Sequence, residues 1–152
     1  MNLQSYLDEN GVRYRISRHS ITFTAQELAA AEHFPGKRVI KPVVIQADGH
    51  FVMCALPACY RIDIAELKQQ LCVKDVHLID EETLRQLFDD CEAGAEPPIG
   101  QLYGMSTIMD ESLSRGNQVM FQAGTHRDAV EMSLAEYRRI AQPEIAHFGR
   151  PM

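Results

Sequence analysis

Residues 39–56 read VIKPVVIQADGHFVMCAL, and this stretch decides the fold. It contains two apolar runs that favour β-strands, joined at residues 47–49 by the sequence ADG, a strong signal for a tight turn. We therefore expect an antiparallel hairpin. Lys41 lies inside the first run, and Pro42 beside it cannot donate to a strand ladder, so this strand is expected to lie at a sheet edge or to carry a bulge there.

Helices and further strands are expected on both sides of the hairpin. Three helix starts are capping boxes, at Thr24, Asp63 and Ser133, and Asp80 caps a fourth helix. Strands are expected over residues 12–17, 39–45, 51–56, 76–79, 106–109, 119–121 and 129–132. Because helices and strands are interspersed and hairpins occur among them, we expect an α+β fold: a single domain with a mixed, mostly antiparallel sheet and surrounding helices.

The length of 152 residues favours one domain, expected over residues 1–142, followed by a loose tail over residues 143–152. The N-terminus lacks the features of a signal peptide, and no apolar run approaches about 18 residues, so a cytoplasmic protein is expected. The cysteines show no close-paired spacing and are interpreted as buried, reduced thiols; they are Cys54, Cys59, Cys72 and Cys91.

The net charge of −6 argues against non-specific coating of nucleic acid. The charge is uneven, however, because cations outnumber acids in residues 1–41, whereas residues 75–96 are strongly acidic. A local basic patch could meet one end of a nucleic acid, although these side chains could equally form an ordinary solvated face. The cations proposed for phosphate contacts are Arg13, Arg15, Arg18, Lys37 and Arg38.

Two further features suggest a site that binds a polar or anionic ligand. Burial would penalise the Lys41 ammonium unless an anion offsets it, so this residue either contacts a ligand, pairs with a carboxylate or extends to solvent from a strand end. Residues 92–100 read EAGAEPPIG, which is either a rigid connection or a row of fixed backbone amides around a pocket. Gly124 and His126 follow an apolar strand and suit a pocket wall or a plain turn.

Several catalytic patterns are absent from the sequence. It contains no glycine-rich phosphate loop, no nucleophile elbow, no paired histidines of a metal-binding helix and no cysteine pair with zinc spacing. The six histidines are scattered along the chain. We therefore expect no metal.

Taken in chain order, these pieces resemble the YbaK family of aminoacyl-tRNA deacylases, which also form the editing insertion of bacterial prolyl-tRNA synthetases. The resemblance covers residues 12–140. It is carried by His19-Ser20, residues 23–27, Lys41, Ala55-Leu56-Pro57, Ile62-Asp63, residues 91–100, residues 110–113 and residues 121–124.

The resemblance implies hydrolysis of the ester that joins a wrong amino acid to the 3′ end of a tRNA, with Ala- or Cys-tRNA of the proline isoacceptors as first candidates. It implies Lys41 and Gly100 as catalytic residues, and a substrate site formed by Ser20, Pro97, Pro98, Gly124 and His126. No cofactor and no protein nucleophile is implied, because water or a ribose hydroxyl serves. The implied partner is the tRNA acceptor end, with a synthetase as a second candidate and neither a membrane nor DNA.

The chain departs from the family pattern beside the lysine, where Pro42 replaces a hydroxyl residue or asparagine, and in the loop, where two prolines replace one proline and an aromatic residue. A non-catalytic module that binds aminoacyl-tRNA or a small ligand is therefore an alternative. A thiol enzyme that uses Cys54, Cys59 or Cys91 is a third.

Overall fold

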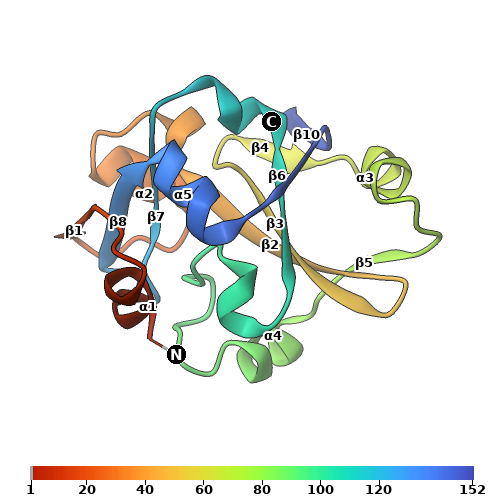
Figure 1. The fold of residues 1–152 in the computed structure, drawn as a ribbon, viewed down its shortest axis with the longest axis horizontal. Coiled ribbons are helices and arrows are strands. Elements are labelled where there is room, and N and C mark those ends of the chain that lie inside the picture. Colours follow the sequence, from red (N-terminus) through yellow and green to blue (C-terminus); the bar gives the residue numbers. More distant parts are fainter. Residues whose placement is uncertain (1) are drawn as a thin grey trace.

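The computed structural model describes residues 2–152, which form a single α+β unit (Figure 1). The α-helices are α1 (Leu3–Glu9), α2 (Ala25–Ala31), α3 (Ile64–Leu71), α4 (Glu81–Leu87) and α5 (Leu134–Ala141). Short 3-10 helices are η1 (Gly36–Arg38), η2 (Gly100–Tyr103) and η3 (Glu111–Arg115). The strands are β1 (Tyr14–Arg18), β2 (Ile40–Ala47), β3 (His50–Pro57), β4 (Tyr60–Ile62), β5 (Val76–Leu78), β6 (Ser106–Asp110), β7 (Gln118–Gln122), β8 (Asp128–Ser133), β9 (Glu144–Ala146) and β10 (Gly149–Pro151).

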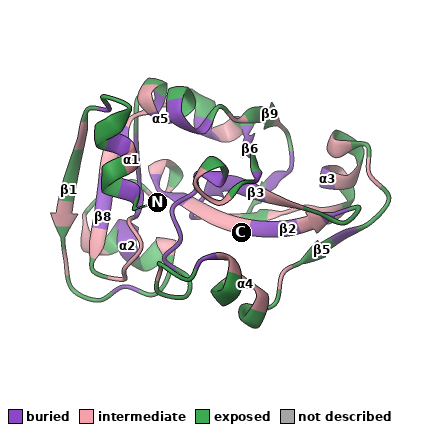
Figure 2. Cartoon of the chain, turned by 60° about the horizontal axis from the view of Figure 1, so that its bottom comes forward, coloured by how far each residue is buried: buried purple, intermediate pink, exposed green. Residues whose placement is uncertain are grey.

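The predicted α+β class is confirmed, but the strands form three sheets within residues 2–152 rather than one. The largest sheet has the order β5-β2-β3-β6-β9 and is mixed, because β3, β6 and β9 run parallel whereas β2 is antiparallel to its neighbours. The second sheet has the order β1-β8-β7, and β1 lies at its exposed edge (Figure 2). The third sheet pairs β10 with β4.

The central hairpin forms as predicted, with β2 and β3 paired along their whole length. Asp48 and Gly49 both have positive φ, at 47° and 86°, as a two-residue turn of this kind requires. Strand β5 covers only the second half of β2, since its register begins at Ile45. The Val44 carbonyl faces β5, and Pro42 shares this direction because it lies two residues earlier. Pro42 therefore lies on an uncovered edge, as predicted.

All four predicted helix caps form. The side chains of Thr24, Asp63, Asp80 and Ser133 each accept a hydrogen bond from the amide three residues later. These bonds satisfy a helix N–H that would otherwise lack a partner.

The C-terminal segment differs from the expected loose tail. Strand β9 adds to the parallel edge of the large sheet and β10 pairs with β4. Between them Phe148 is 1% exposed, and the buried carboxylate of Asp110 accepts from the amides of Phe148 and Gly149 at 2.9 and 2.6 Å. The buried Phe148 side chain and the Asp110 carboxylate thus fix the C-terminal segment in place, which its polar sequence did not indicate.

The main apolar core lies between α1, α5 and the β7–β8 hairpin and includes the fully buried Tyr137 and Phe121. None of the helices formed by residues 2–152 has the length and apolar character needed to cross a bilayer. All four cysteines are free, but only Cys54 is fully buried, and Cys72 is exposed. The expectation of four buried thiols was therefore wrong, since the other three lie at or near the surface.

Candidate functional site

The first feature of the site is a cavity of about 210 Å³ at the uncovered edge of β2. Lys41 lines it together with Phe23, Thr24, Ala25, Ile40, Pro42, Gly94 and Gln122. These residues come from the start of α2, from β2, from the loop after α4 and from the end of β7, so the cavity lies where the two larger sheets meet. The lysine and the glycine–proline loop, far apart in sequence, therefore contribute to one cavity.

The Lys41 ammonium donates to the main-chain carbonyl of Tyr60 and lies 3.9 Å from the Met152 sulfur. No acidic side chain among residues 2–152 forms an ion pair with it. Partial burial lowers the pKa of Lys41 below its usual value, and Cys59 nearby opposes this shift. An ammonium has three N–H donors, so at least one remains for a ligand in the cavity.

The loop over residues 94–100 offers fewer free amides than the sequence predicted. The amide of Gly94 donates to the Glu96 carboxylate, that of Ala95 to the Glu92 carbonyl, and that of Ile99 to the Pro97 carbonyl. The two prolines have no N–H. Within the described chain, Glu96 is the one loop residue that keeps an amide without a protein partner. Of the row expected over residues 92–100, only the amides of Ala93 and Glu96 therefore lack a protein partner in the described chain.

Gly100 is buried, and its amide donates to the Thr107 hydroxyl at 2.8 Å. A Cβ added at Gly100 would lie 2.6 Å from the Met105 carbonyl and 2.8 Å from that of Ser106. The glycine is therefore required by close backbone packing. This geometry gives Gly100 a structural role, and Gly100 is not among the residues that line the Lys41 cavity.

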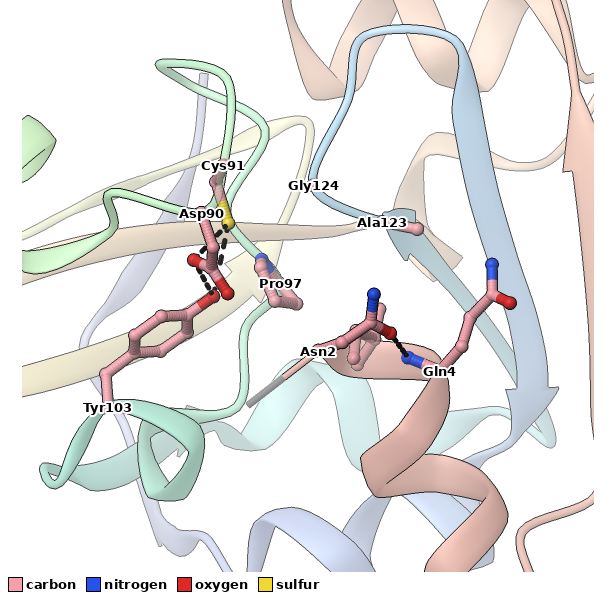
Figure 3. A pocket seen from close by; sticks show the side chains of 9 residues that line it. Asn2, Gln4, Asp90, Cys91, Pro97, Tyr103, Ala123 and Gly124 are labelled. Atoms are coloured by element: carbon pink, nitrogen blue, oxygen red, sulfur yellow. Dashed lines mark hydrogen bonds between the residues drawn. The ribbon is translucent and has the colours of Figure 1, made fainter.

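Pro97 and Gly124 line a second cavity, of about 230 Å³ (Figure 3). The start of α1 faces a hydrogen-bonded cluster of Asp90, Cys91 and Tyr103 across this cavity (Figure 3). Burial raises the pKa of the Cys91 thiol to about 12. This cavity therefore carries a neutral thiol and no cation.

The remaining predicted residues do not line the Lys41 cavity. The Pro98 carbonyl accepts from the buried Tyr137 hydroxyl at 2.6 Å. Ser20 is exposed. The His126 ring contacts the carbonyls of Thr22 and Ala93, at 2.9 Å from Nδ1 and 2.8 Å from Nε2. Carbonyl oxygens only accept, so only the protonated ring completes both bonds.

Lys41 is the one predicted site residue that lines this cavity in the described chain; among the lining residues that were missed, Gln122 and Phe23 belong to segments that carried the resemblance. The Gln122 amide nitrogen donates to the Thr22 carbonyl at 3.1 Å. That carbonyl fixes the amide orientation and leaves the Gln122 oxygen as an acceptor at the cavity. Phe23 is 64% exposed at the cavity and packs against the His126 ring. The signal for Phe23 was a large apolar side chain beside a helix cap.

Residues 2–152 contain no cluster of three or more His, Cys, Asp and Glu side chains that could hold a metal. Burial raises the pKa of Cys54 to about 12, as for Cys91. Both sulfurs are therefore poor nucleophiles, which argues against the thiol-enzyme alternative at these two positions.

Comparison with protein families gives a match over residues 19–140 to the model described as the aminoacyl-tRNA editing domain. A proline–tRNA ligase of Dehalococcoides mccartyi is 28% identical over 116 residues, which are 76% of this chain and 20% of the ligase. The chain thus spans about a fifth of the ligase. A multifunctional Ser/Thr-tRNA deacylase, ProXp-y of Escherichia coli K12, is 24% identical over 153 residues, covering 97% of this chain and 91% of the deacylase.

Solved structures show the same fold. A protein solved as hypothetical superposes with a TM-score of 0.87 at 19% identity, over 97% of this chain and 99% of that one. A candidate trans-editing enzyme for prolyl tRNA synthetase superposes with a TM-score of 0.84 at 20% identity, over 97% and 94% of the two chains.

Proposed function

The chain belongs to the family of aminoacyl-tRNA editing domains, and from this premise we propose that it hydrolyses mischarged aminoacyl-tRNA in trans. The observation that carries the proposal is Lys41, a partly buried ammonium that lines a cavity and forms no ion pair within residues 2–152. A cation in this position stabilises a ligand oxygen that becomes negative.

In the proposed reaction the ester carbonyl of the aminoacyl end lies against the Lys41 ammonium. Water adds to the carbonyl carbon, the bond to the ribose oxygen breaks, and the proton from water ends on that oxygen. Free amino acid and uncharged tRNA are released. An activated ester needs modest catalysis, and one oxyanion donor contributes on the order of 3 kcal/mol, so positioning of the ester by the Lys41 ammonium is sufficient.

We assign two supporting roles to residues outside the predicted set. The side-chain oxygen of Gln122 accepts from the α-ammonium of the substrate, because its nitrogen is committed to Thr22. The exposed ring of Phe23, at the rim of the cavity, packs against the terminal adenosine. Both roles are consistent with a substrate that enters with its amino acid first.

The cavity favours a small, weakly polar amino acid. Its volume is about 210 Å³, and the Thr24 hydroxyl already accepts the capping bond from the Glu27 amide. A serine or threonine side chain would therefore find few free partners, whereas alanine or cysteine would need none. We propose Ala- or Cys-tRNA of the proline isoacceptors as substrates, in the cytoplasm and in association with a synthetase.

The test is a deacylation panel with proline tRNA carrying alanine, cysteine, serine or threonine. Clearance of the alanyl or cysteinyl form faster than its spontaneous hydrolysis supports the proposal. If serine or threonine is cleared preferentially, the specificity assignment fails. If no charged tRNA is cleared faster than in buffer, the enzyme assignment fails, and the binding module becomes the better account.

A further inference from the structure

A third cavity, strongly basic, lies near Lys41 and has no role in the proposed hydrolysis. Its volume is about 230 Å³, and it is lined by Lys37, Arg38, Pro57, Tyr60, Ser112 and Arg115. Lys37 and Arg38 come from η1, and Arg115 comes from η3. The two elements are far apart in the sequence: Arg38 in η1 and Leu113 in η3 are separated by 75 residues. Three cations and no carboxylate line it, which is the composition of an anion site.

The three cations are not neutralised by the protein. Lys37, Arg38 and Arg115 form no salt bridge within residues 2–152. The nearest acids on the same turn are already engaged. Asp110 accepts from Ser112 and from the amides of Phe148 and Gly149, and Glu111 lies 3.1 Å from His147. The Ser112 hydroxyl is thereby used as well, so the free donors of this cavity are the three cations and the Tyr60 hydroxyl, which has no side-chain hydrogen bond within residues 2–152.

The guanidinium of Arg38 is held in place by a close approach to the main chain. It donates to the Leu113 carbonyl at 3.3 Å, and a Cβ added at Gly116 would lie 1.8 Å from one of its nitrogens. A glycine at residue 116 thus leaves the space that Arg38 occupies. The other guanidinium donors remain free for a ligand, because Arg38 forms no other side-chain hydrogen bond in the described chain.

The basic cavity is joined to the Lys41 cavity through Tyr60. The carbonyl of Tyr60 accepts from the Lys41 ammonium, and Tyr60 also lines the basic cavity. Arg38 precedes Lys41 by three residues, a span of at most about 10 Å of chain. Pro57, also in the basic cavity, pairs with Ile40 beside Lys41. A polyanion whose end occupies the Lys41 cavity therefore has the basic cavity within its reach.

The structure also divides the basic patch that the sequence suggested. Arg15 forms an ion pair with Glu131 at 2.8 Å, and the amide of Arg13 bonds to the Glu136 carboxylate. These two arginines lie beside acids on the β1 side of the molecule. Lys37 and Arg38 instead join Arg115, a cation that the sequence did not group with them.

We propose that Lys37, Arg38 and Arg115 bind backbone phosphates of the tRNA strand that leads to the aminoacyl end. This inference rests on the proposed function, since it places the phosphates relative to an ester held at Lys41. The site acts by holding the strand in register with the Lys41 cavity and takes no part in the chemistry.

The first test measures binding of uncharged tRNA as a function of salt. Lys37→Ala and Arg115→Ala are each expected to weaken binding on the order of fivefold at about 0.1 M salt, and to lower the slope of log K against log salt by about 0.7–0.9. Lys74→Ala is the matched control, because Lys74 is exposed beside the hairpin turn at the other end of β2. Pocket variants that bind within twofold of the wild type overturn the proposal.

A second variant leaves every charge in place. In Gly116→Ala the three atoms nearest to the new methyl group all belong to the flexible end of Arg38, so the protein is expected to fold and the guanidinium to move. We expect weaker tRNA binding with an unchanged melting temperature. Full tRNA affinity in this variant contradicts the role of Arg38.

Two further measurements distinguish a site for tRNA phosphates from a site for free anions and from a site that acts on the reaction itself. Pocket variants should lose kcat/KM on aminoacyl-tRNA but retain it on aminoacyl-adenosine, which has no phosphate; equal loss on both overturns the proposal. Micromolar binding of inorganic phosphate that Arg115→Ala abolishes, with tRNA binding unchanged, identifies a free-anion site and also overturns it. Binding of tRNA can be measured without hydrolysis. If the wild-type protein binds tRNA but does not hydrolyse any charged tRNA, and the pocket variants lose this binding, the phosphate site is supported while the proposed function fails.

Discussion

The ammonium of Lys41 donates a hydrogen bond to the main-chain carbonyl of Tyr60. Tyr60 is the first residue of β4, shortly after the end of β3, and it also lines the basic cavity. The hydrogen bond therefore links the Lys41 side chain to a wall of that cavity. A carbonyl orients the ammonium without neutralising its charge. Lys41 is thereby positioned at its cavity while it remains a cation available to a ligand.

The first prediction concerns the stability of Lys41→Met across pH. Partial burial lowers the pKa of Lys41 below 10.5, so between the folded and unfolded pKa values the unfolded chain binds more protons. The free energy of unfolding of the wild type should therefore rise, relative to the variant, as pH approaches 10.5. Urea melts of both proteins at neutral and alkaline pH test this. A difference that is constant with pH, or that changes in the opposite direction, contradicts the burial of the ammonium.

The second prediction separates structure from catalysis at Gly100. Gly100→Ala places a methyl group against the Met105 and Ser106 carbonyls and should cost about 3 kcal/mol of unfolding free energy. Thr107→Val removes the acceptor of the Gly100 amide and should cost about 1–3 kcal/mol. Denaturant melts measure both effects. If Gly100→Ala keeps wild-type stability and loses only activity, Gly100 acts directly on the substrate.

The third prediction concerns Pro42, where the chain departs from its family. Because the Pro42 nitrogen faces the uncovered edge of β2, Pro42→Ala breaks no ladder bond and should change stability by less than about 1 kcal/mol. It adds an amide donor at the edge of the Lys41 cavity, so kcat/KM should equal or exceed that of the wild type. A loss of more than tenfold would show that the proline ring itself shapes the site.

The fourth prediction concerns the C-terminal segment. Burial raises the pKa of Asp110, but hydrogen bonds from Ser112, Phe148 and Gly149 outweigh it and hold the pKa below 3.8. This stabilisation is present above the unfolded pKa and is lost as pH falls through the folded value. Asp110→Asn should cost about 3 kcal/mol at neutral pH and make unfolding less sensitive to acid. Glu144→Gln, at an exposed site in β9, is the control and should match the wild type.

Local signals in the sequence predicted most of the secondary structure, because caps and turns depend on a few adjacent residues. Thr24 and the turn at Asp48-Gly49 are examples. The division into three sheets was not predictable, since strand partners such as β6 and β9 are chosen by long-range packing. The order of the C-terminal segment likewise depends on Asp110, some 38 residues before Phe148.

The site was predicted in part for the same reason. Lys41 was detectable because a cation inside an apolar strand conflicts with its surroundings. The loop was detectable by its prolines, but the sequence does not show which amides the protein itself satisfies, and Gly100 proved to donate to Thr107. Arg115 was missed because only the fold brings it to Arg38.

The central claim is that the Lys41 ammonium stabilises the ester oxygen during hydrolysis. The most direct test is single-turnover deacylation of the best substrate by Lys41→Ala, with Lys74→Ala as control and melting temperatures measured for both. The account predicts a rate lower by about 10²–10³ in Lys41→Ala, with the fold intact and the control unchanged. A folded Lys41→Ala variant that deacylates at the wild-type rate would contradict it.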